Sequence, residues 1–145
     1  MSLTDEHRFG MQLGQLTRGW RAELDRRLAG LGLSQARWLV LLHLARFTTE
    51  APTQRELAQS LGVEGPTLAR LLDSLESQGL VRRQAVLEDR RAKKIVLCES
   101  AEPLIQQIEA IASTLRAELL AGIDEAELQV AMRVHARILA NLERT

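Results

Sequence analysis

Basic residues between positions 82 and 94 form the part of this 145-residue sequence with the clearest chemical potential. Six cations stand against two carboxylates there, a net charge of +4; they are Arg82, Arg83, Arg90, Arg91, Lys93 and Lys94, with Glu88 and Asp89. Guanidinium and ammonium groups at this density favour binding to phosphate oxygens. The segment is therefore a candidate polyanion-binding element.

The residues around these cations predict a β-hairpin. Leu80–Val86 and Lys93–Leu97 are short and contain β-branched residues, and a charged turn, Leu87–Ala92, separates them. Neighbouring side chains of a strand point to opposite faces, so we expect about half of the flanking cations to contact phosphate; these are Arg82, Arg83, Lys93 and Lys94.

The segment before the hairpin predicts two helices joined by a tight turn. Thr53 and Glu56 have the spacing of a capping box, Gly62 suits a turn, and Pro66 fits the first turn of the next helix. This order is typical of a helix-turn-helix, whose second helix fits a major groove of DNA.

The second of these helices has a polar arc that makes it a candidate recognition helix. Arg70 can make a bidentate contact with a guanine edge or pair with phosphate, and its neighbours on the arc are Pro66, Thr67 and Ser74. The alternative for Arg70 is a solvated side chain or an ion pair with Asp73. For the other three it is helix capping and solubility.

Three runs of sequence resemble the MarR family of winged-helix regulators. They are residues 64–70 (EGPTLAR), 75–80 (LESQGL) and 89–94 (DRRAKK), with Asp89 and Arg91 as the Asp-x-Arg wing motif. Residues 92–95 and 101–105 look like the SlyA branch in particular. The resemblance covers about residues 8–142.

The resemblance implies a homodimer that binds a palindromic DNA operator. The recognition helix would enter the major groove, and the wing would meet the minor groove through Arg91 first and Arg90 next, with Asp89 orienting the turn by a charged hydrogen bond. It also implies release by small anionic phenolic ligands.

The remaining helical stripes complete a mainly α fold with a small β wing. We expect the winged helix-turn-helix in residues 34–98 and a helical dimerisation region made from residues 1–33 and 99–145. The first helix should run about 26 residues, roughly 39 Å, as long as the whole globule of such a chain. Its apolar stripe therefore favours packing on a second copy.

Two tryptophans on the first two helices are candidates for an effector site. Trp20 and Trp38 either face a crevice, where Arg18 or Arg21 holds the carboxylate of a small aromatic ligand, or pack in the core or dimer interface. Cys98 is a candidate thiol redox sensor, against the alternative of a packed thiol, and no second Cys can resolve a sulfenate within the chain.

Composition narrows the function classes further. Nineteen basic and nineteen acidic residues give zero net charge, which excludes a uniformly cationic coat but not a local basic patch. One Cys and the lack of a long apolar run favour a cytoplasmic protein without a membrane span. No nucleophile, metal or cofactor motif stands out, so we expect neither an enzyme nor a cofactor. A winged-helix module that binds a protein instead of DNA is the alternative.

Overall fold

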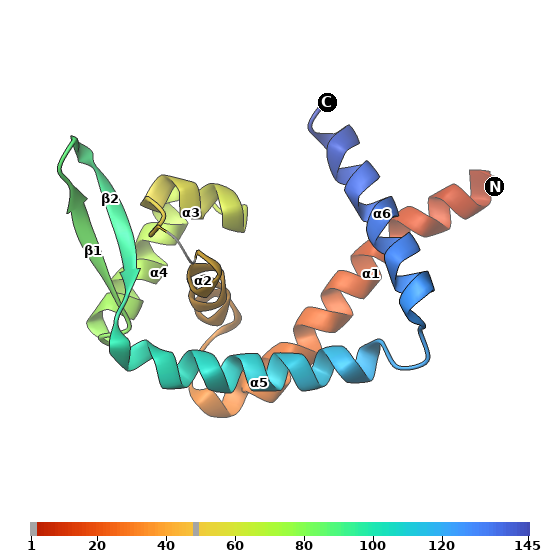
Figure 1. Ribbon diagram of the computed structural model, residues 1–145, viewed down its shortest axis with the longest axis horizontal. Coiled ribbons are helices and arrows are strands. Elements are labelled where there is room, and N and C mark those ends of the chain that lie inside the picture. The colour runs from red at the N-terminus through yellow and green to blue at the C-terminus, as the bar shows by residue number, and fades with distance from the viewer. Residues whose placement is uncertain (1–2, 48–49) are drawn as a thin grey trace. The chain divides into compact units, whose positions relative to one another are not determined.

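The helices and the hairpin of this protein are seen in a computed structural model that describes residues 3–47 and 50–145, apart from the side chains of Leu3 and Arg90 (Figure 1). The chain divides into two units, residues 1–112 and Ser113–Thr145. The elements in order are α1 (Leu3–Leu28), η1 (Ala29–Leu31), α2 (Gln35–Arg46), α3 (Gln54–Leu61), α4 (Gly65–Ser77), β1 (Val81–Val86), β2 (Asp89–Leu97), η2 (Glu99–Ala101), α5 (Glu102–Leu119) and α6 (Glu125–Leu142).

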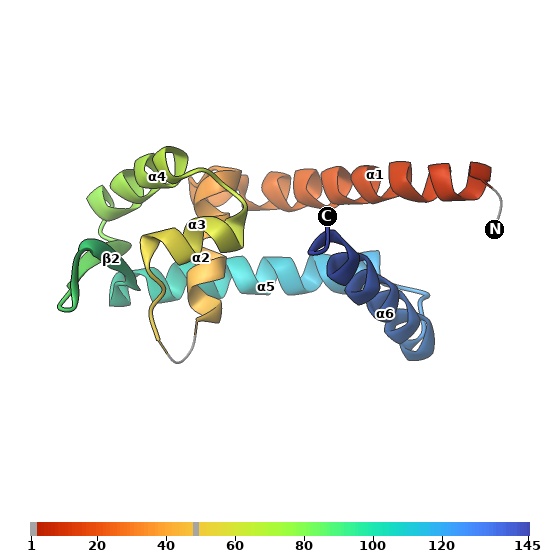
Figure 2. The same ribbon diagram turned by 90° about the horizontal axis from the view of Figure 1, so that it is seen from above.

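The predicted fold class, mainly α with a small β wing, is confirmed. Figures 1 and 2 show α3, α4 and the hairpin gathered with α2 in the first unit. α1 has the expected length of 26 residues. Ser34 is the N-cap residue of α2, although its side chain makes no capping hydrogen bond.

The helix-turn-helix begins with the predicted capping box. Thr53 Oγ1 accepts a hydrogen bond from the Glu56 N–H, and Glu56 Oε1 accepts one from the Thr53 N–H, both at 3.1 Å. Gly62 ends α3 in the left-handed region, with φ of 70°, which a residue with a Cβ seldom adopts. The capping box therefore sets the start of α3, and the left-handed backbone of Gly62 sets its end.

A second glycine sets the step from α4 to the wing. Gly79 has φ of 77°, its N–H donates to Glu76 O, and the Leu80 N–H donates to Leu75 O, both at 3.0 Å. These are the two bonds of a Schellman motif, and they satisfy the last carbonyls of the helix. β1 starts at Val81, so its position follows directly from the end of α4.

Apolar side chains hold these elements together. The fully buried side chains come from α1, α2, α3, α4, both strands and α5; the largest in the first unit are Trp38, Leu28, Leu41, Leu57, Leu68, Leu72, Leu75, Ile95 and Ile108. Each such leucine stabilises the fold by roughly 1.5–3 kcal/mol relative to an exposed position. The polar arc of α4 faces away from this core.

The wing differs from its predicted boundaries. β2 begins at Asp89 instead of Lys93, so the turn is Leu87–Glu88 and not Leu87–Ala92. The register pairs Ala85 with Lys93 and then Val86 with Asp89, which marks a β-bulge in the charged run. The charged residues 89–92 were predicted as turn because of their polarity. Both faces of an exposed two-stranded hairpin can carry charged side chains, so polarity does not exclude a strand there.

The segment before α3 pairs with β2 of the wing at an isolated antiparallel bridge. The Ile95 N–H donates to Pro52 O at 2.9 Å, and Thr53 forms an isolated antiparallel bridge with Lys94. Lys94 Nζ also donates to Glu50 Oε1 at 2.6 Å. The start of the helix-turn-helix and the wing are thus bonded to each other through the backbone.

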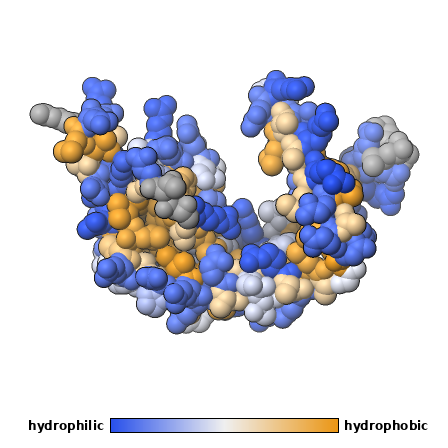
Figure 3. Space-filling model, viewed as in Figure 1, coloured by the Kyte–Doolittle hydropathy of each residue, from blue (hydrophilic) through white to orange (hydrophobic). Residues whose placement is uncertain are grey.

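Large apolar side chains remain exposed on the two terminal helices. On α1 they are Phe9, Met11, Leu13 and Leu16, and on α6 they are Val130, Met132, Val134, Leu139 and Leu142. Apolar patches interrupt the hydrophilic surface of α6 in Figure 3. α6 starts with a capping box, in which Asp124 Oδ1 accepts a hydrogen bond from the Glu127 N–H at 2.8 Å.

Within the described residues, no single helix is both long and apolar enough to cross a membrane, although Thr4–Leu31 and Gln35–Arg46 would pass together as a pair bent by 93°.

Candidate nucleic-acid interface

The polar arc of α4 presents the predicted residues to solvent. Arg70 and Pro66 are exposed, and Thr67 and Ser74 are half-buried. No hydrogen bond or ion pair engages the Arg70 side chain within the described residues. Asp73, the alternative partner of Arg70, is instead paired with Arg83, whose Nη2 lies 2.8 Å from Asp73 Oδ1.

The tip of the wing is shaped by the Asp-x-Arg motif. Asp89 Oδ1 accepts a hydrogen bond from the Arg91 N–H at 2.9 Å, which is the orienting bond expected of Asp89. The Arg91 side chain is exposed, as is that of Lys93. The Arg90 side chain lies outside the described part of the chain. The bulge and this hydrogen bond together fix the backbone from which Arg91 projects.

The two adjacent arginines of β1 have different environments. Arg82 is exposed, whereas the side chain of Arg83 is only 19% exposed. Arg83 Nη2 donates to Ala69 O at 2.9 Å, Nη1 lies 2.9 Å from Glu76 Oε1, and Nε donates to Gln54 Oε1 at 3.3 Å. Arg83 therefore connects β1 to α4 and α3 and does not face solvent as a phosphate ligand would.

Lys94 is the second flanking cation that is held by the protein. Its bond to Glu50 raises the pKa of the Lys94 ammonium and lowers the pKa of the Glu50 carboxyl. Of the four flanking cations, Arg82 and Lys93 are exposed, while Arg83 and Lys94 form ion pairs. Contact of about half of these four cations with phosphate stays a prediction.

A groove of about 1090 Å³ separates the helix-turn-helix from the wing. Its walls are one side of α3 with the turn at Gly62–Gly65, and the β2 segment Asp89–Lys93. Among its described lining residues are three cations, Arg55, Arg91 and Lys93, and one carboxylate, that of Asp89. Arg55 was not predicted from the sequence, although its place in the first turn of α3 beside the capping box was a usable signal.

The candidate residues of an effector-binding site lie partly in the core and partly at the surface. Trp38 is 2% exposed and its Nε1–H donates to Asp25 Oδ1 at 3.4 Å, so this indole packs in the core. Trp20 is half-buried, and Arg18 and Arg21 are exposed on α1. Cys98 is half-buried at the end of β2, and its N–H donates to Leu80 O.

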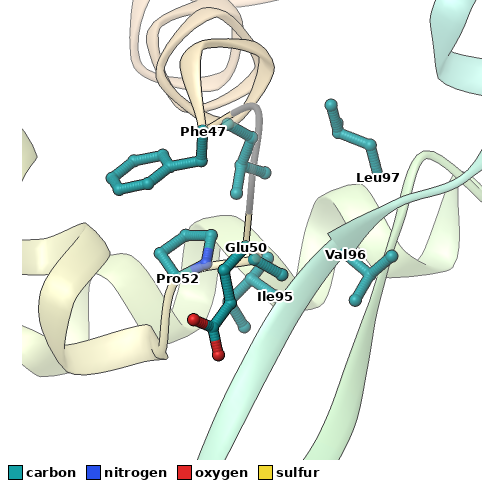
Figure 4. Close-up of a pocket in the computed structure, with 8 residues that line it drawn as sticks. Phe47, Glu50, Pro52, Ile95, Val96 and Leu97 are labelled. Atoms are coloured by element: carbon teal, nitrogen blue, oxygen red, sulfur yellow. The ribbon is translucent and has the colours of Figure 1, made fainter.

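A smaller cavity of about 250 Å³ lies between the end of α2, the segment before α3 and β2 (Figure 4). Phe47, Pro52 and Ile95 give it an apolar lining. Its charged lining residue, Glu50, is already paired with Lys94. Its described lining residues do not provide the convergent polar groups that orient a ligand, and none of them lines the groove of Arg55 and Arg91.

Comparison with known proteins places these features in a family. The model of the MarR family matches residues 31–92, which hold α2 to the wing. The crystal structure of the transcriptional regulator PA3341 is 69% identical, covers 94% of this chain and 99% of that chain, and has a TM-score of 0.88.

More distant solved structures have the same fold. A MarR-family transcriptional regulator from Rhodococcus sp. RHA1 is 26% identical over 97% of this chain and 96% of that chain, with a TM-score of 0.78. MepR from S. aureus, solved as a complex with DNA, is 22% identical over 92% of this chain and 97% of that chain, with a TM-score of 0.82. The chain belongs to the MarR family, whose members are transcriptional regulators and not enzymes.

Proposed function

We propose that this protein is a homodimeric transcriptional regulator that binds a palindromic DNA operator through α4 and the wing. The observation that carries the proposal is that Arg70 on α4 and Arg91 on the wing are both exposed, while Arg83 and Lys94 are held in ion pairs. The chain thus separates cations that stabilise its own structure from cations left available to a polyanion.

In this proposal residues 64–78 enter a major groove and residues 85–94 lie against the flanking minor groove. Arg70 donates two guanidinium N–H groups to a guanine edge in a bidentate contact, and Thr67 contacts phosphate or a thymine methyl. Arg91 enters the minor groove, where the negative potential is greatest. The likeness in fold to MepR, which was solved with DNA, supports this arrangement.

The groove between α3 and the wing suits a phosphodiester backbone. A DNA strand that runs between α4 and the wing has to cross this groove. Arg55 and Lys93 line the groove with positive charge. Contacts of this kind fix the register of a protein on DNA without reading sequence. We assign Arg55, Arg82 and Lys93 to phosphate binding.

The exposed apolar residues of α1 and α6 support a dimer built from the chain's two ends, residues 1–33 and 99–145. Several large apolar side chains exposed on one helix are typical of an interface, and each of the two helices has such a set. Two-fold symmetry then requires two inverted half-sites about 10 bp apart.

Release by a small aromatic carboxylate is the regulatory part of the proposal. Arg18 and Arg21 are exposed and available to a carboxylate, and Trp20, half-buried on the same helix, offers an aromatic face. Trp38 would contribute to such a site only as buried support, because it is packed in the core. The assignment to the SlyA branch rests on residues 92–95 and 101–105 of the sequence alone.

Selection from random duplex DNA with the purified protein tests the proposal. The expected product is an enriched inverted repeat whose two halves are about one helical turn apart, bound with an affinity that falls steeply with salt. A selection that enriches no sequence contradicts DNA recognition and favours a protein-binding winged helix. An enriched sequence without two-fold symmetry contradicts the dimeric mode alone.

A further inference from the structure

Arg83 bonds to one face of α4, immediately beside the residue proposed to read the operator. Its contacts on α4 are Ala69 O, Asp73 Oδ1 and Glu76 Oε1, spaced four and three residues apart. We call Arg83 and these three residues, with Gln54, the Arg83 cluster. The spacing means that a single guanidinium spans two turns of the same helical face. Ala69 directly precedes Arg70, so the cluster holds the turn of helix that carries Arg70.

The cluster also determines which partner Asp73 has. Asp73 lies three residues after Arg70, a spacing at which oppositely charged side chains of a helix pair. In the structure Asp73 pairs instead with Arg83, at 2.8 Å, and the Arg70 side chain has no such partner among the described residues. The carboxylate nearest in sequence to Arg70 is therefore already occupied.

We propose that Arg83 is a positioning residue for DNA recognition, which orients α4 and keeps Asp73 from forming an ion pair with Arg70. The inference rests on the proposed function and adds a residue that does not touch DNA. Arg83 suits this role better than phosphate binding, because its side chain is only 19% exposed and its donors contact Gln54, Ala69, Asp73 and Glu76.

Loss of Arg83 should release Asp73 to compete with DNA for Arg70. We expect Arg83→Met to weaken binding to the selected operator by roughly tenfold, a part of what a bidentate base contact contributes. The slope of log affinity against log salt should stay at the wild-type value, because no phosphate contact is lost. Arg82→Met, the adjacent exposed residue, removes the same charge and should reduce that slope by about 1.

A pair of double variants separates this role from a general change in charge. Arg83→Met with Asp73→Asn removes the competing carboxylate and should recover most of the lost affinity. Arg83→Met with Glu76→Gln restores the same net charge, but Glu76 lies six residues from Arg70, beyond the reach of an intrahelical pair. Recovery in the first double variant and not in the second supports the proposal. Equal recovery in both overturns the competition between Asp73 and DNA.

Arg83→Lys provides a conservative comparison. One ammonium keeps the charge but cannot bond to three separated acceptors in fixed directions, so we expect an affinity between wild type and Arg83→Met. Thermal unfolding of every variant, followed by circular dichroism, shows whether the fold is retained at the temperature of the binding assay. A folded Arg83→Met protein that binds the operator as tightly as wild type overturns the inference.

The outcomes also distinguish this inference from the proposed function. If wild-type protein selects no sequence, both are wrong. If wild type selects an operator and Arg83→Met reduces the salt slope as Arg82→Met does, DNA binding stands and Arg83 is a phosphate contact instead. If affinity falls at a constant slope and only the Asp73 double variant recovers it, both proposals are supported.

Discussion

The N–H of Ile95 in the wing donates a hydrogen bond to the carbonyl oxygen of Pro52, two residues before α3 begins, at 2.9 Å. Together with the isolated bridge between Thr53 and Lys94, this bond joins the segment before the helix-turn-helix to β2. The start of α3 and the base of the wing are thus fixed relative to each other, and α4 follows from the turn at Gly62. The proposed DNA contacts of α4 and the wing depend on this connection.

Arg70→Ala should reduce discrimination between the selected operator and a scrambled duplex. Removal of a bidentate base contact costs about 1–3 kcal/mol of specificity, whereas binding to the scrambled duplex should change only by the effect of one charge. Fluorescence anisotropy with both duplexes measures the difference. Arg116→Ala, an exposed arginine of α5, is the matched control. Equal losses on both duplexes would assign Arg70 to phosphate.

Arg91→Ala should weaken operator binding and flatten its salt dependence. Each phosphate contact contributes about 0.9 to the slope of log affinity against log salt, so the slope should fall by about 1. Titrations at several salt concentrations give both quantities. The wing assignment fails if affinity and slope are unchanged at physiological salt.

Leu139→Glu should shift the protein from dimer to monomer. Leu139 is 62% exposed on α6, and a carboxylate placed in an apolar interface loses its hydration without gaining a partner. Sedimentation velocity over a range of protein concentrations measures the assembly. Ser60→Glu, at an exposed position of α3 outside the proposed dimerisation region, adds the same charge and should leave the dimer intact. A dimer that persists in Leu139→Glu places the interface elsewhere.

Gly79→Ala should destabilise the fold by about 1–2 kcal/mol, the cost of a left-handed backbone for a residue with a Cβ. Its φ is 77°, and an added Cβ would meet nothing within 4 Å, so backbone strain alone is measured. Gly30→Ala has the same open surroundings without the positive φ and should not lose stability. Urea unfolding monitored by circular dichroism compares the two. Similar losses in both variants would contradict the role given to the Schellman turn.

The Glu50–Lys94 pair predicts a defined dependence of stability on pH. Because folding lowers the pKa of Glu50 below its usual value of 4.5, this carboxyl stabilises the fold above that pH, and the contribution is lost as pH falls through the lowered pKa. Lys94, whose pKa is raised, contributes below its usual pKa and loses that contribution only as pH rises through the raised value in the alkaline range.

The free energy of unfolding of wild type and Glu50→Gln should therefore differ at neutral pH and converge in acid. Urea titrations across the acid range test this, with Glu143→Gln, an exposed carboxyl near the C-terminus, as the control. A difference that stays constant down to the lowest pH would show that Glu50 acts through packing instead of charge.

The parts of the fold set by local chemistry could be predicted from the sequence. The capping box of Thr53 and the turn at Gly62 depend on residues within a few positions, so spacing alone predicted them. The orienting bond of Asp89 is equally local, because it spans two residues.

Contacts that depend on register and on packing could not be predicted in this way. Strand alternation indicated that one of Arg82 and Arg83 faces the protein, but the choice depends on where β1 pairs with β2, and the predicted turn was too long. The partner of Lys94 is Glu50, 44 positions away in the sequence, and only the folded backbone brings the two together.

The backbone hydrogen bonds of the Schellman turn at Gly79 fix the connection between the last turn of α4 and the first residue of β1. In a DNA-binding protein so built, the distance between the base pairs met by the helix and those met by the wing is a property of the backbone. Homologous proteins of this kind can acquire a different operator sequence through substitutions on α4. They can change its internal spacing only by insertion or deletion near residue 79, so operator length should diverge far more slowly than operator sequence.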